Sequence, residues 1–377
     1  MPTRSLRIAI LGTRGVPARY GGFETLAAEL SARLAERGHS VDVYCRRGRV
    51  DGGVLPKGVR QRFVPMLPTK YLETVSHTAL SVLAAIPRRY DAILLVNAAN
   101  AIFSGVPRVF GTPVALNVDG IERKRAKWGR AGKAWYLVGE RLATIFPNSI
   151  ISDAIVIEQY YRTRYHASST MIPYGSTILD RLPPPDLSPY GLEPGRYLLY
   201  VSRLEPENNA ALVAESYQDV PGDLPLAIVG EAPYATAYKA RVTELAARDP
   251  RVRMLGSIYG SGYQELQRGA LAYIQATEVG GTHPALIEAM GAGNLVLAMG
   301  TPENIEVTAG TALIFTDRAS LAQVMTQVAE WGGSGGELAE MAAAARKRAL
   351  DVYSWEAVTD AYEALFASMT SNGRHRG

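Results

Sequence analysis

The sequence predicts an α/β protein built from two doubly wound units in tandem. The chain has 377 residues, which exceeds the usual size of one domain. Buried-strand patterns followed by helical periodicity occur in both halves, and a stretch rich in proline and glycine, residues 180–196, separates them. Hydrophobic residues make up 47% and charged residues 20%, a balance typical of folded globular proteins.

The N-terminal half begins with a strand, a loop, a helix and a second strand. Arg7–Gly12 (RIAILG) predicts a buried parallel strand. Apolar residues then recur at helical spacing from Phe23 to Leu34, and Gly38 ends this helix. The second strand is expected at Ser40–Cys45. Further buried strands are predicted at residues 92–97 and 113–118.

The C-terminal half repeats this alternation after the linker. Helix formers dominate residues 336–368, interrupted at 353–356, where Ser354 is placed to cap a last helix. We therefore expect an N-terminal domain at 1–180, a second domain at 190–352 and a final helix at 353–370. Strands of the second domain are predicted at residues 197–201, 224–230, 272–275 and 294–299.

Charge and cysteine content limit the partners and the compartment. The net charge of +4 favours phosphorylated ligands or an anionic membrane surface but is too weak to indicate nucleic acid. Cys45 is the single cysteine, so the chain forms no intramolecular disulfide. The N-terminus lacks a signal-peptide pattern, and no run of about 18 apolar residues occurs. We expect a cytoplasmic protein, and these features are compatible with peripheral contact at the inner face of the cell membrane.

A glycine-rich loop, GTRGVPARYGG at residues 12–22, joins the first strand to the first helix. Loops in this position bind ligands in α/β folds, and the helix N-terminus near Gly22 offers free amides to an anion. An ordinary βα turn would have a similar composition. The glycine spacing does not match the dinucleotide fingerprint G-x-G-x-x-G, and Arg46 and Arg47 stand where a ribose-binding acid would close the second strand.

A second strand-to-helix turn, EVGGTHPALIEAM at residues 278–290, follows the strand predicted at 272–275. Pro284 fits the first turn of a helix, which places Glu288 one turn inside it. A carboxylate there can accept hydrogen bonds from the vicinal hydroxyls of a ribose, while the amides before it meet a diphosphate. The alternative is a solvated glutamate on a helix face.

Arg203 lies just after another strand, in the sequence VSRLEPENN. Its guanidinium can make a bidentate contact with a diphosphate. The alternative is a surface ion pair with Glu205 or Glu207, which would contribute little to stability.

Asp119 follows the strand predicted at residues 113–118, at the carboxyl end of the N-terminal sheet. It can orient or deprotonate an acceptor hydroxyl, or it can cap the segment that follows. A basic stretch comes next, for which a solvated helix face is the common explanation. Its members are Arg123, Lys124, Arg125, Lys127, Trp128, Arg130 and Lys133.

These stretches together resemble the retaining GT-B glycosyltransferases of family 4. The matching sequences are GTRGVPARYGGFET, NVDGIERKRAKW, VSRLEPENN, EVGGTHPALIEAMGAGNLVLA and YSWE, spread over residues 12–356. The long first stretch resembles the bacterial rhamnosyltransferase subgroup of cell-wall and capsular polysaccharide synthesis. The resemblance implies two Rossmann-like domains facing a deep cleft, with the acceptor in the N-terminal half, the donor in the C-terminal half, and the last helix packing back on the N-terminal domain.

The resemblance also implies roles for individual residues. We expect Asp119, Arg203 and Glu278 to be the catalytic residues, with Asp119 in a region where many relatives carry a histidine. Relatives usually carry a lysine where this chain has Asn208, and a glutamate where it has Gly280, with Glu278 nearby but out of register. Donor-binding residues are expected to be Gly21, Gly22, Arg203, Asn208, Gly280, Gly281, Thr282 and Glu288. Acceptor-binding residues are expected to be Arg14, Arg19, Tyr20, Arg123, Lys124, Arg125 and Trp128.

The expected reaction moves a sugar from a nucleotide diphosphate to a hydroxyl of a glycan or lipid-diphosphate-linked sugar, with retention. The first donor is dTDP-L-rhamnose, with UDP- and GDP-sugars as alternatives. No D-x-D pair occurs, so no metal and no cofactor are expected, and Arg203 with backbone amides must balance the diphosphate charge. A nucleotide-sugar 2-epimerase of the same fold and a weakly catalytic nucleotide-sugar binding protein remain as alternatives.

Overall fold

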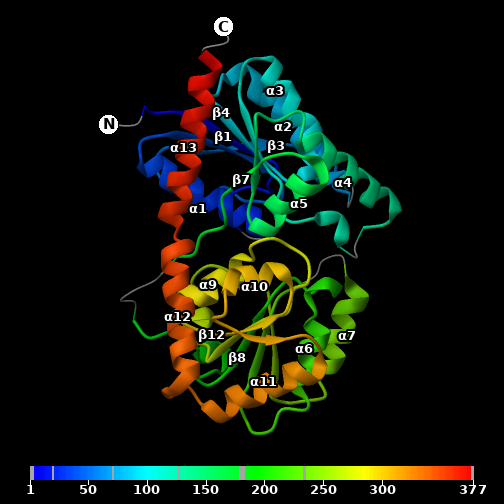
Figure 1. The fold of residues 1–377 in the computed structure, drawn as a ribbon, viewed down its shortest axis with the longest axis vertical. Helices are drawn as coiled ribbons and strands as arrows, with labels where there is room; N and C mark the ends of the chain where they lie inside the picture. The colour runs from blue at the N-terminus through cyan, green and yellow to red at the C-terminus, as the bar shows by residue number, and fades with distance from the viewer. Residues whose placement is uncertain are drawn as a thin grey trace. The chain divides into compact units, whose positions relative to one another are not determined.

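The computed structural model describes residues 4–18, 21–69, 72–125, 128–177, 183–231 and 235–374. The chain forms two compact units (Figure 1). The first comprises Met1–Lys124, Trp128–Gly175 and Trp355–Gly377, and the second comprises Arg125–Lys127 and Ser176–Ser354. Each unit is built on a parallel sheet with helices, which confirms the predicted fold class.

The sheet of the first unit has the strand order β3-β2-β1-β4-β5-β6-β7, and all its pairs are parallel. The strand numbers increase from β1 toward one edge of the sheet and from β4 toward the other. The reversal between β1 and β4 is the position where doubly wound sheets open a crevice at their carboxyl edge. The strands are β1 (Arg7–Leu11), β2 (Ser40–Arg46), β3 (Val59–Val64), β4 (Ala92–Val96), β5 (Val114–Asn117), β6 (Ser149–Ser152) and β7 (Thr170–Met171).

Helices connect these strands and bury the apolar faces of the sheet. The core between them includes Leu11, Leu95, Leu116 and Tyr161, all nearly inaccessible to solvent. The connecting elements are α1 (Gly22–Glu36), α2 (Glu73–Ala85), η1 (Ile86–Arg88), η2 (Ala98–Ser104), α3 (Gly105–Val109), η3 (Glu122–Lys124), α4 (Arg130–Ala143) and α5 (Ile155–Tyr165), where η marks a 3-10 helix.

The second sheet repeats the design with the order β10-β9-β8-β11-β12-β13, again fully parallel. Here the order reverses between β8 and β11. The strands are β8 (Leu198–Val201), β9 (Leu226–Val229), β10 (Val252–Gly256), β11 (Ala272–Gln275), β12 (Leu295–Met299) and β13 (Leu313–Phe315). The helices are η4 (Ser188–Tyr190), η5 (Pro206–Asn208), α6 (Ala210–Tyr217), α7 (Thr236–Ala246), α8 (Ser261–Gly269), α9 (Pro284–Ala292), α10 (Pro302–Thr308), α11 (Arg318–Trp331) and α12 (Gly336–Val352).

The strands predicted from continuous apolar runs are present, with ends that differ by at most two residues. Five strands were not predicted. β3 carries the polar sequence VRQRFV because it lies at an edge of its sheet, and β6, β7 and β13 are only two to four residues long. β10 is also an edge strand, and it has no fully buried position. Edge position, or a length of two or three residues, removes the buried apolar run that identifies a central strand, but neither accounts for β6, which lies inside its sheet.

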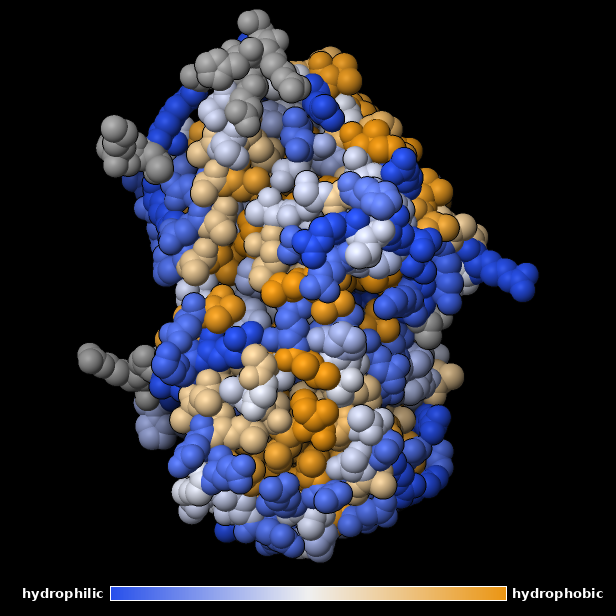
Figure 2. Space-filling view, viewed as in Figure 1, coloured by the Kyte–Doolittle hydropathy of each residue, from blue (hydrophilic) through white to orange (hydrophobic). Residues whose placement is uncertain are grey.

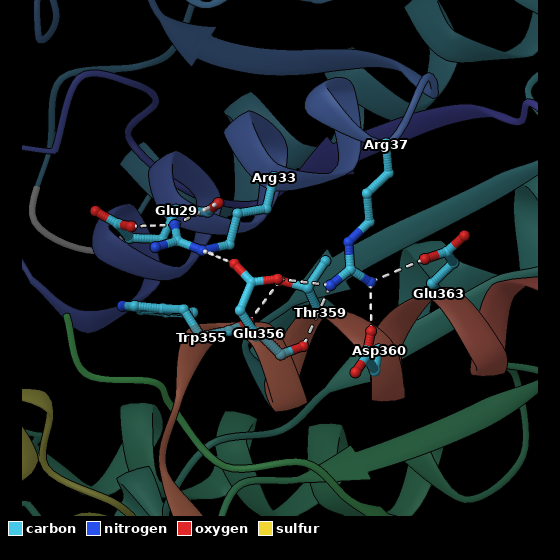
Figure 3. A network of polar contacts seen from close by, with 8 residues as sticks. All are labelled: Glu29, Arg33, Arg37, Trp355, Glu356, Thr359, Asp360 and Glu363. Carbon is cyan, nitrogen blue, oxygen red and sulfur yellow. Dashed lines mark hydrogen bonds and ion pairs between the residues drawn. The ribbon is translucent and has the colours of Figure 1, made fainter. Parts of the chain in front are cut away.

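The last helix, α13 (Trp355–Arg374), belongs to the first unit and packs against α1. Arg37, which follows α1, contacts three carboxylates on one face of α13 (Figure 3). Its guanidinium lies 2.8 Å from Glu356, 2.6 Å from Asp360 and 3.0 Å from Glu363. The spacing of these acids brings them to one side of the helix, where one arginine neutralises their mutual repulsion.

Trp355 fixes the start of α13. Its indole lies over Gly175 so closely that a Cβ on that glycine would come within 2.4 Å of the ring. The Arg33 guanidinium also contacts the Trp355 ring, with its carbon 5.7 Å from the ring centre. The C-terminal helix is therefore attached to the first unit by both packing and charge.

We predict that Arg37→Ala lowers the stability of the first unit by about 1–2 kcal/mol, because three carboxylates lose their common partner. Calorimetric unfolding measures the change. Arg241→Ala, which removes an exposed arginine that contacts the single carboxylate of Glu215, is the matched control and should change stability by less than about 0.5 kcal/mol. Equal effects of the two substitutions would show that the cluster does not hold α13.

Candidate active site

Predicted site residues of both units follow the carboxyl ends of parallel strands, and those of the second unit lie at its strand-order reversal. In the second unit, Arg203 and Asn208 follow β8, and Glu278–Glu288 follow β11, its neighbour across the reversal. In the first unit, the glycine loop follows β1, and Asp119 follows β5. The carboxyl edge at such a reversal is the position where open α/β sheets bind ligands.

Asn208 stabilises the loop that contains Arg203 by hydrogen bonds. Its side-chain amide donates to the Arg203 carbonyl over 2.6 Å, and its own carbonyl accepts from the Tyr200 hydroxyl over 2.5 Å. Asn208 is buried, whereas the Arg203 side chain is 29% exposed and lies 3.8 Å from Glu205. Asn208 thus fixes the backbone beside Arg203 and leaves the guanidinium accessible from solvent.

Asn209 ties this loop to the loop after β11. Its amide donates to the Ala276 carbonyl and to the Glu278 carboxylate, each over 2.9 Å. The Glu278 backbone N–H donates to the Glu207 carbonyl over 3.0 Å. Asn209 adopts a left-handed conformation with φ of 62°, which asparagine tolerates better than most residues. The exposed Glu278 side chain therefore has a structural role in holding the two loops together.

His283 occupies the space above Gly280. A Cβ on Gly280 would come within 2.3 Å of the imidazole, so a larger residue at position 280 would require the ring to shift. Burial lowers the pKa of His283 to about 3, and the nearby charges of Arg125 and Arg203 act in the same direction. The imidazole is therefore neutral at physiological pH, directly before Pro284, where α9 presents its N-terminal amides. Gly281 and Thr282 are buried in the same turn.

Glu288 lies on α9 one turn after its start, as predicted. The Tyr263 hydroxyl of α8 donates to its carboxylate over 2.5 Å, and Gln267 in turn donates to that hydroxyl over 2.9 Å. Burial, together with the charge of Glu288, raises the pKa of Tyr263 well above its usual value. Tyr263 therefore stays protonated and orients the carboxylate.

The basic run after Asp119 is divided between structural partners. Arg123 contacts the buried Glu140 over 3.0 Å and donates to the Tyr160 hydroxyl over 2.8 Å, within the first unit. Arg125 groups with the second unit, where it lies 3.9 Å from Glu205 and 3.8 Å from Glu207. Lys124 is exposed, and Trp128 packs on Tyr136. Lys127 lies outside the described residues.

Two glycines shape the loop after β1. Gly12 and Gly15 have φ of 99° and 121°, and a Cβ on Gly15 would overlap Cys45. Gly21 instead has extended backbone and lies beside Glu24, whose carboxylate accepts from the Arg14 N–H over 2.8 Å. The expected acceptor residues Arg19 and Tyr20 lie outside the described residues.

An arginine cluster surrounds Glu73 beside this loop. Arg46 and Arg49 each contact the Glu73 carboxylate over 2.8 Å, and Arg14 lies 3.5 Å away. Burial alone would raise the pKa of Glu73, but the hydrogen bond from Arg46 and the neighbouring positive charges lower it overall. One turn further along α2, burial and the charge of Arg46 lower the pKa of His77 to about 4.

Asp119 is held in a left-handed conformation with φ of 57° by a network that reaches α13. The Asn117 side chain accepts from the Asp119 N–H over 3.0 Å and donates to the buried Tyr362 hydroxyl over 2.9 Å. The Tyr174 hydroxyl approaches the Asp119 carboxylate at 3.5 Å. This geometry presents Asp119 at the carboxyl edge of the first sheet.

Sequence reasoning did not assign Tyr263, His283, Glu73 or Tyr362. His283 carried a usable signal, since it directly precedes the proline that starts a helix. The other three act through contacts between segments far apart in the chain. Over the described ranges, no group of histidine, cysteine, aspartate or glutamate is placed to hold a metal ion.

Two family matches cover separate parts of the chain. Residues 195–330 match the family described as glycosyl transferases group 1. Residues 96–177 match the family described as a domain of unknown function, DUF1972. No curated protein sequence matches the chain significantly.

Solved structures share the fold over nearly the whole chain. Sucrose-phosphate synthase from Thermosynechococcus elongatus superposes with a TM-score of 0.79 at 19% identity, covering 97% of this chain and 100% of that one. Anabaena HepE in complex with UDP-glucose gives 0.74 at 16%, covering 97% and 100%. WaaG, a glycosyltransferase involved in lipopolysaccharide biosynthesis, gives 0.71 at 17%, covering 94% and 98%.

These likenesses and the two sheets define the fold as that of the GT-B glycosyltransferases. The family match over residues 195–330 supports a glycosyltransferase.

We predict that His77→Gln reduces the acid sensitivity of folding. Between pH 6.5 and about 4 the unfolded chain protonates this histidine while the folded protein does not, so stability falls as the pH falls through this window. At pH 5 the penalty is about 2 kcal/mol. Unfolding by urea at pH 7 and pH 5 measures it. His166→Gln, at an exposed position, is the control. If His77→Gln loses as much stability between pH 7 and pH 5 as the wild type, His77 is not the source of the acid sensitivity.

Proposed function

We propose that this protein is a retaining glycosyltransferase that moves L-rhamnose from dTDP-L-rhamnose to a hydroxyl of a lipid-diphosphate-linked sugar. The main support for donor binding is that Arg203, the neutral His283 and the N-terminus of α9 lie at one strand-order reversal. Glu288 lies one helical turn further along α9. This arrangement combines a cation, amide donors and a ribose-binding carboxylate, as a nucleoside diphosphate requires.

The diphosphate would lie between Arg203 and the first turn of α9. The 3.8 Å separation of Arg203 and Glu205 is an ion-pair contact and not a hydrogen bond, so the guanidinium can turn to a phosphate without losing a short bond to Glu205. Arg125 adds a second positive charge near His283. His283, being neutral, can donate a hydrogen bond to an oxygen of the diphosphate or of the sugar without adding charge.

The ribose would bind Glu288. Since Tyr263 donates to one oxygen of this carboxylate, the side chain is oriented before the nucleotide arrives. Preorganisation of this kind reduces the ordering cost of binding.

For the acceptor half we propose Asp119 as the group that orients or deprotonates the attacking hydroxyl. Asn117 and Tyr362 hold its backbone in place, which supports a fixed position for the carboxylate. We propose front-side displacement without a metal, in which the leaving phosphate helps to deprotonate the acceptor. Arg203 and the α9 amides then stabilise the charge that develops on it.

The choice of donor rests on the resemblance of the opening loop to rhamnosyltransferases. Anabaena HepE, a structural neighbour, was solved with UDP and with UDP-glucose, so UDP-sugars are the first competitors in any assay. Nothing in the fold or the comparisons favours the 2-epimerase or the weakly catalytic binding protein.

Glu288→Ala should weaken nucleotide binding by about 2–4 kcal/mol, because two charge-assisted hydrogen bonds to the ribose are lost. Tyr263→Phe should give a smaller loss, since the carboxylate remains but is less well oriented. Titration calorimetry with the preferred nucleotide sugar measures both. Glu244→Gln, on the exposed face of α7, is the control, and wild-type affinity in a folded Glu288→Ala protein would discard the ribose assignment.

Arg203→Ala should nearly abolish sugar transfer while leaving the fold intact, because the developing charge on the leaving diphosphate loses its main cation. Initial rates of nucleotide release in the presence of acceptor measure the effect. Arg196→Ala, an exposed arginine of the same unit, should keep the wild-type rate. Wild-type turnover in Arg203→Ala would mean that the diphosphate binds elsewhere.

The substrate assignment is tested by incubating the enzyme with dTDP-L-rhamnose, UDP-glucose, UDP-GlcNAc and GDP-mannose, each with a short-chain lipid-diphosphate sugar. Nucleotide release and lipid product are followed together. We expect acceptor-dependent release from dTDP-L-rhamnose. Preference for another donor would overturn the rhamnose assignment alone, whereas no acceptor-dependent release with any donor would favour a binding protein.

A further inference from the structure

We infer that the surface formed by η2, α3 and α4 of the first unit docks on an anionic lipid membrane. This surface, called here the α3–α4 patch, comprises Ile102, Val109, Phe110, Val138 and Ile145 with the basic residues around them. The inference deepens the proposed function, because a lipid-linked acceptor is met at a membrane, but it rests on observations of its own.

The patch exposes several large apolar side chains to solvent. Val109 is 84% exposed and Phe110 is 63% exposed, and both stand at the end of α3. Val138 and Ile145, on and just after α4, are each about half exposed. Figure 2 shows apolar residues gathered along the surface over α3 and its neighbours. Exposed apolar groups concentrated in one region mark an interaction surface more often than scattered single ones.

The elements that carry the patch lie against one another. A hollow of about 520 Å³ is lined by Ile102, Val106, Val109 and Phe146 together with Gly105 and Arg108. The Arg108 guanidinium donates to the Ile145 and Phe146 carbonyls over 3.4 and 3.2 Å, which joins α3 to the chain after α4. α4 also crosses η2 closely, since a Cβ on Gly139 would lie 2.6 Å from the Ala98 carbonyl oxygen.

The exposed charged residues of the three elements that form the patch have one sign. The elements η2, α3 and α4 carry Arg108, Arg130, Lys133 and Arg141, all exposed. Their one acidic residue, Glu140, is buried and bonded to Arg123, Tyr160 and Tyr165. An apolar surface whose own elements expose cations and no carboxylate complements lipid headgroups that carry phosphate.

Charge also argues against a second copy of this chain as the occupant. A two-fold dimer would bring the same four cations of each copy together at one interface, which costs free energy. In the part of the chain that the structure describes, no helix is long and apolar enough to cross a bilayer. Contact through the patch would therefore place α3 and α4 at the headgroup level, with their apolar side chains among the acyl chains.

Vesicle co-sedimentation tests the inference on the full chain. Phosphatidylcholine vesicles with and without phosphatidylglycerol are the probes. We expect binding only when phosphatidylglycerol is present, with affinity falling as salt rises. Val109→Ser combined with Phe110→Ser, and separately Lys133→Glu combined with Arg141→Glu, should each weaken binding about tenfold or more. Leu350→Ser and Arg248→Glu, at exposed positions of the second unit, are the matched controls.

Each outcome bears on the docking surface independently of the enzymatic proposal. Unchanged binding in both patch variants, or equal binding to neutral vesicles, would overturn the inference. A dimer in sedimentation velocity that dissociates in the Val109→Ser, Phe110→Ser variant would assign the patch to a second copy instead. Nucleotide affinity measured on the same variants without lipid should stay at the wild-type value, so failure of vesicle binding and failure of donor binding are distinguishable.

Discussion

The candidate donor site depends on one constraint, the bonding of the loops that follow β8 and β11. Because β8 and β11 are neighbours in the sheet, the loops that follow them begin at adjacent strand ends. Asn209 links the two loops through hydrogen bonds to the Ala276 carbonyl and the Glu278 carboxylate. With this link in place, Arg203 and the start of α9 hold a fixed relation, as binding of a diphosphate requires. A site assembled from loops gains its precision from such cross-links.

This chain differs from the family that it resembles at two positions of the candidate donor site, and both residues have local contacts that explain what they do there. At position 280, the His283 ring occupies the space that a larger side chain would need, so such a side chain would require the ring to move. Position 208 holds an asparagine whose amide is bonded to the Arg203 carbonyl, so it supports the arginine instead of adding a second cation. The positive charge beside His283 comes from Arg125 as well as Arg203.

The central strands, the helix start at Pro284 and the position of Glu288 were predictable because buried apolar runs and a proline at a helix N-terminus are local signals. The Tyr263–Glu288 hydrogen bond and the arginine cluster around Glu73 could not be predicted from the sequence. Their partners lie 24 to 59 residues apart in the chain and on different elements. Arg123 and Arg125 looked alike in sequence. Only the fold shows that Glu140 engages the first, while Glu205 and Glu207 engage the second.

Hydrogen–deuterium exchange with and without nucleotide tests the central claim most directly. If a nucleoside diphosphate binds at the β8/β11 reversal, saturating nucleotide sugar should slow exchange of amides in residues 202–209 and 280–290, where the loop and the first turns of α9 lie. Amides of α11, remote in sequence from both loops, should exchange at the same rate in both states. Protection confined to other segments, or none with any nucleotide sugar, would contradict the account.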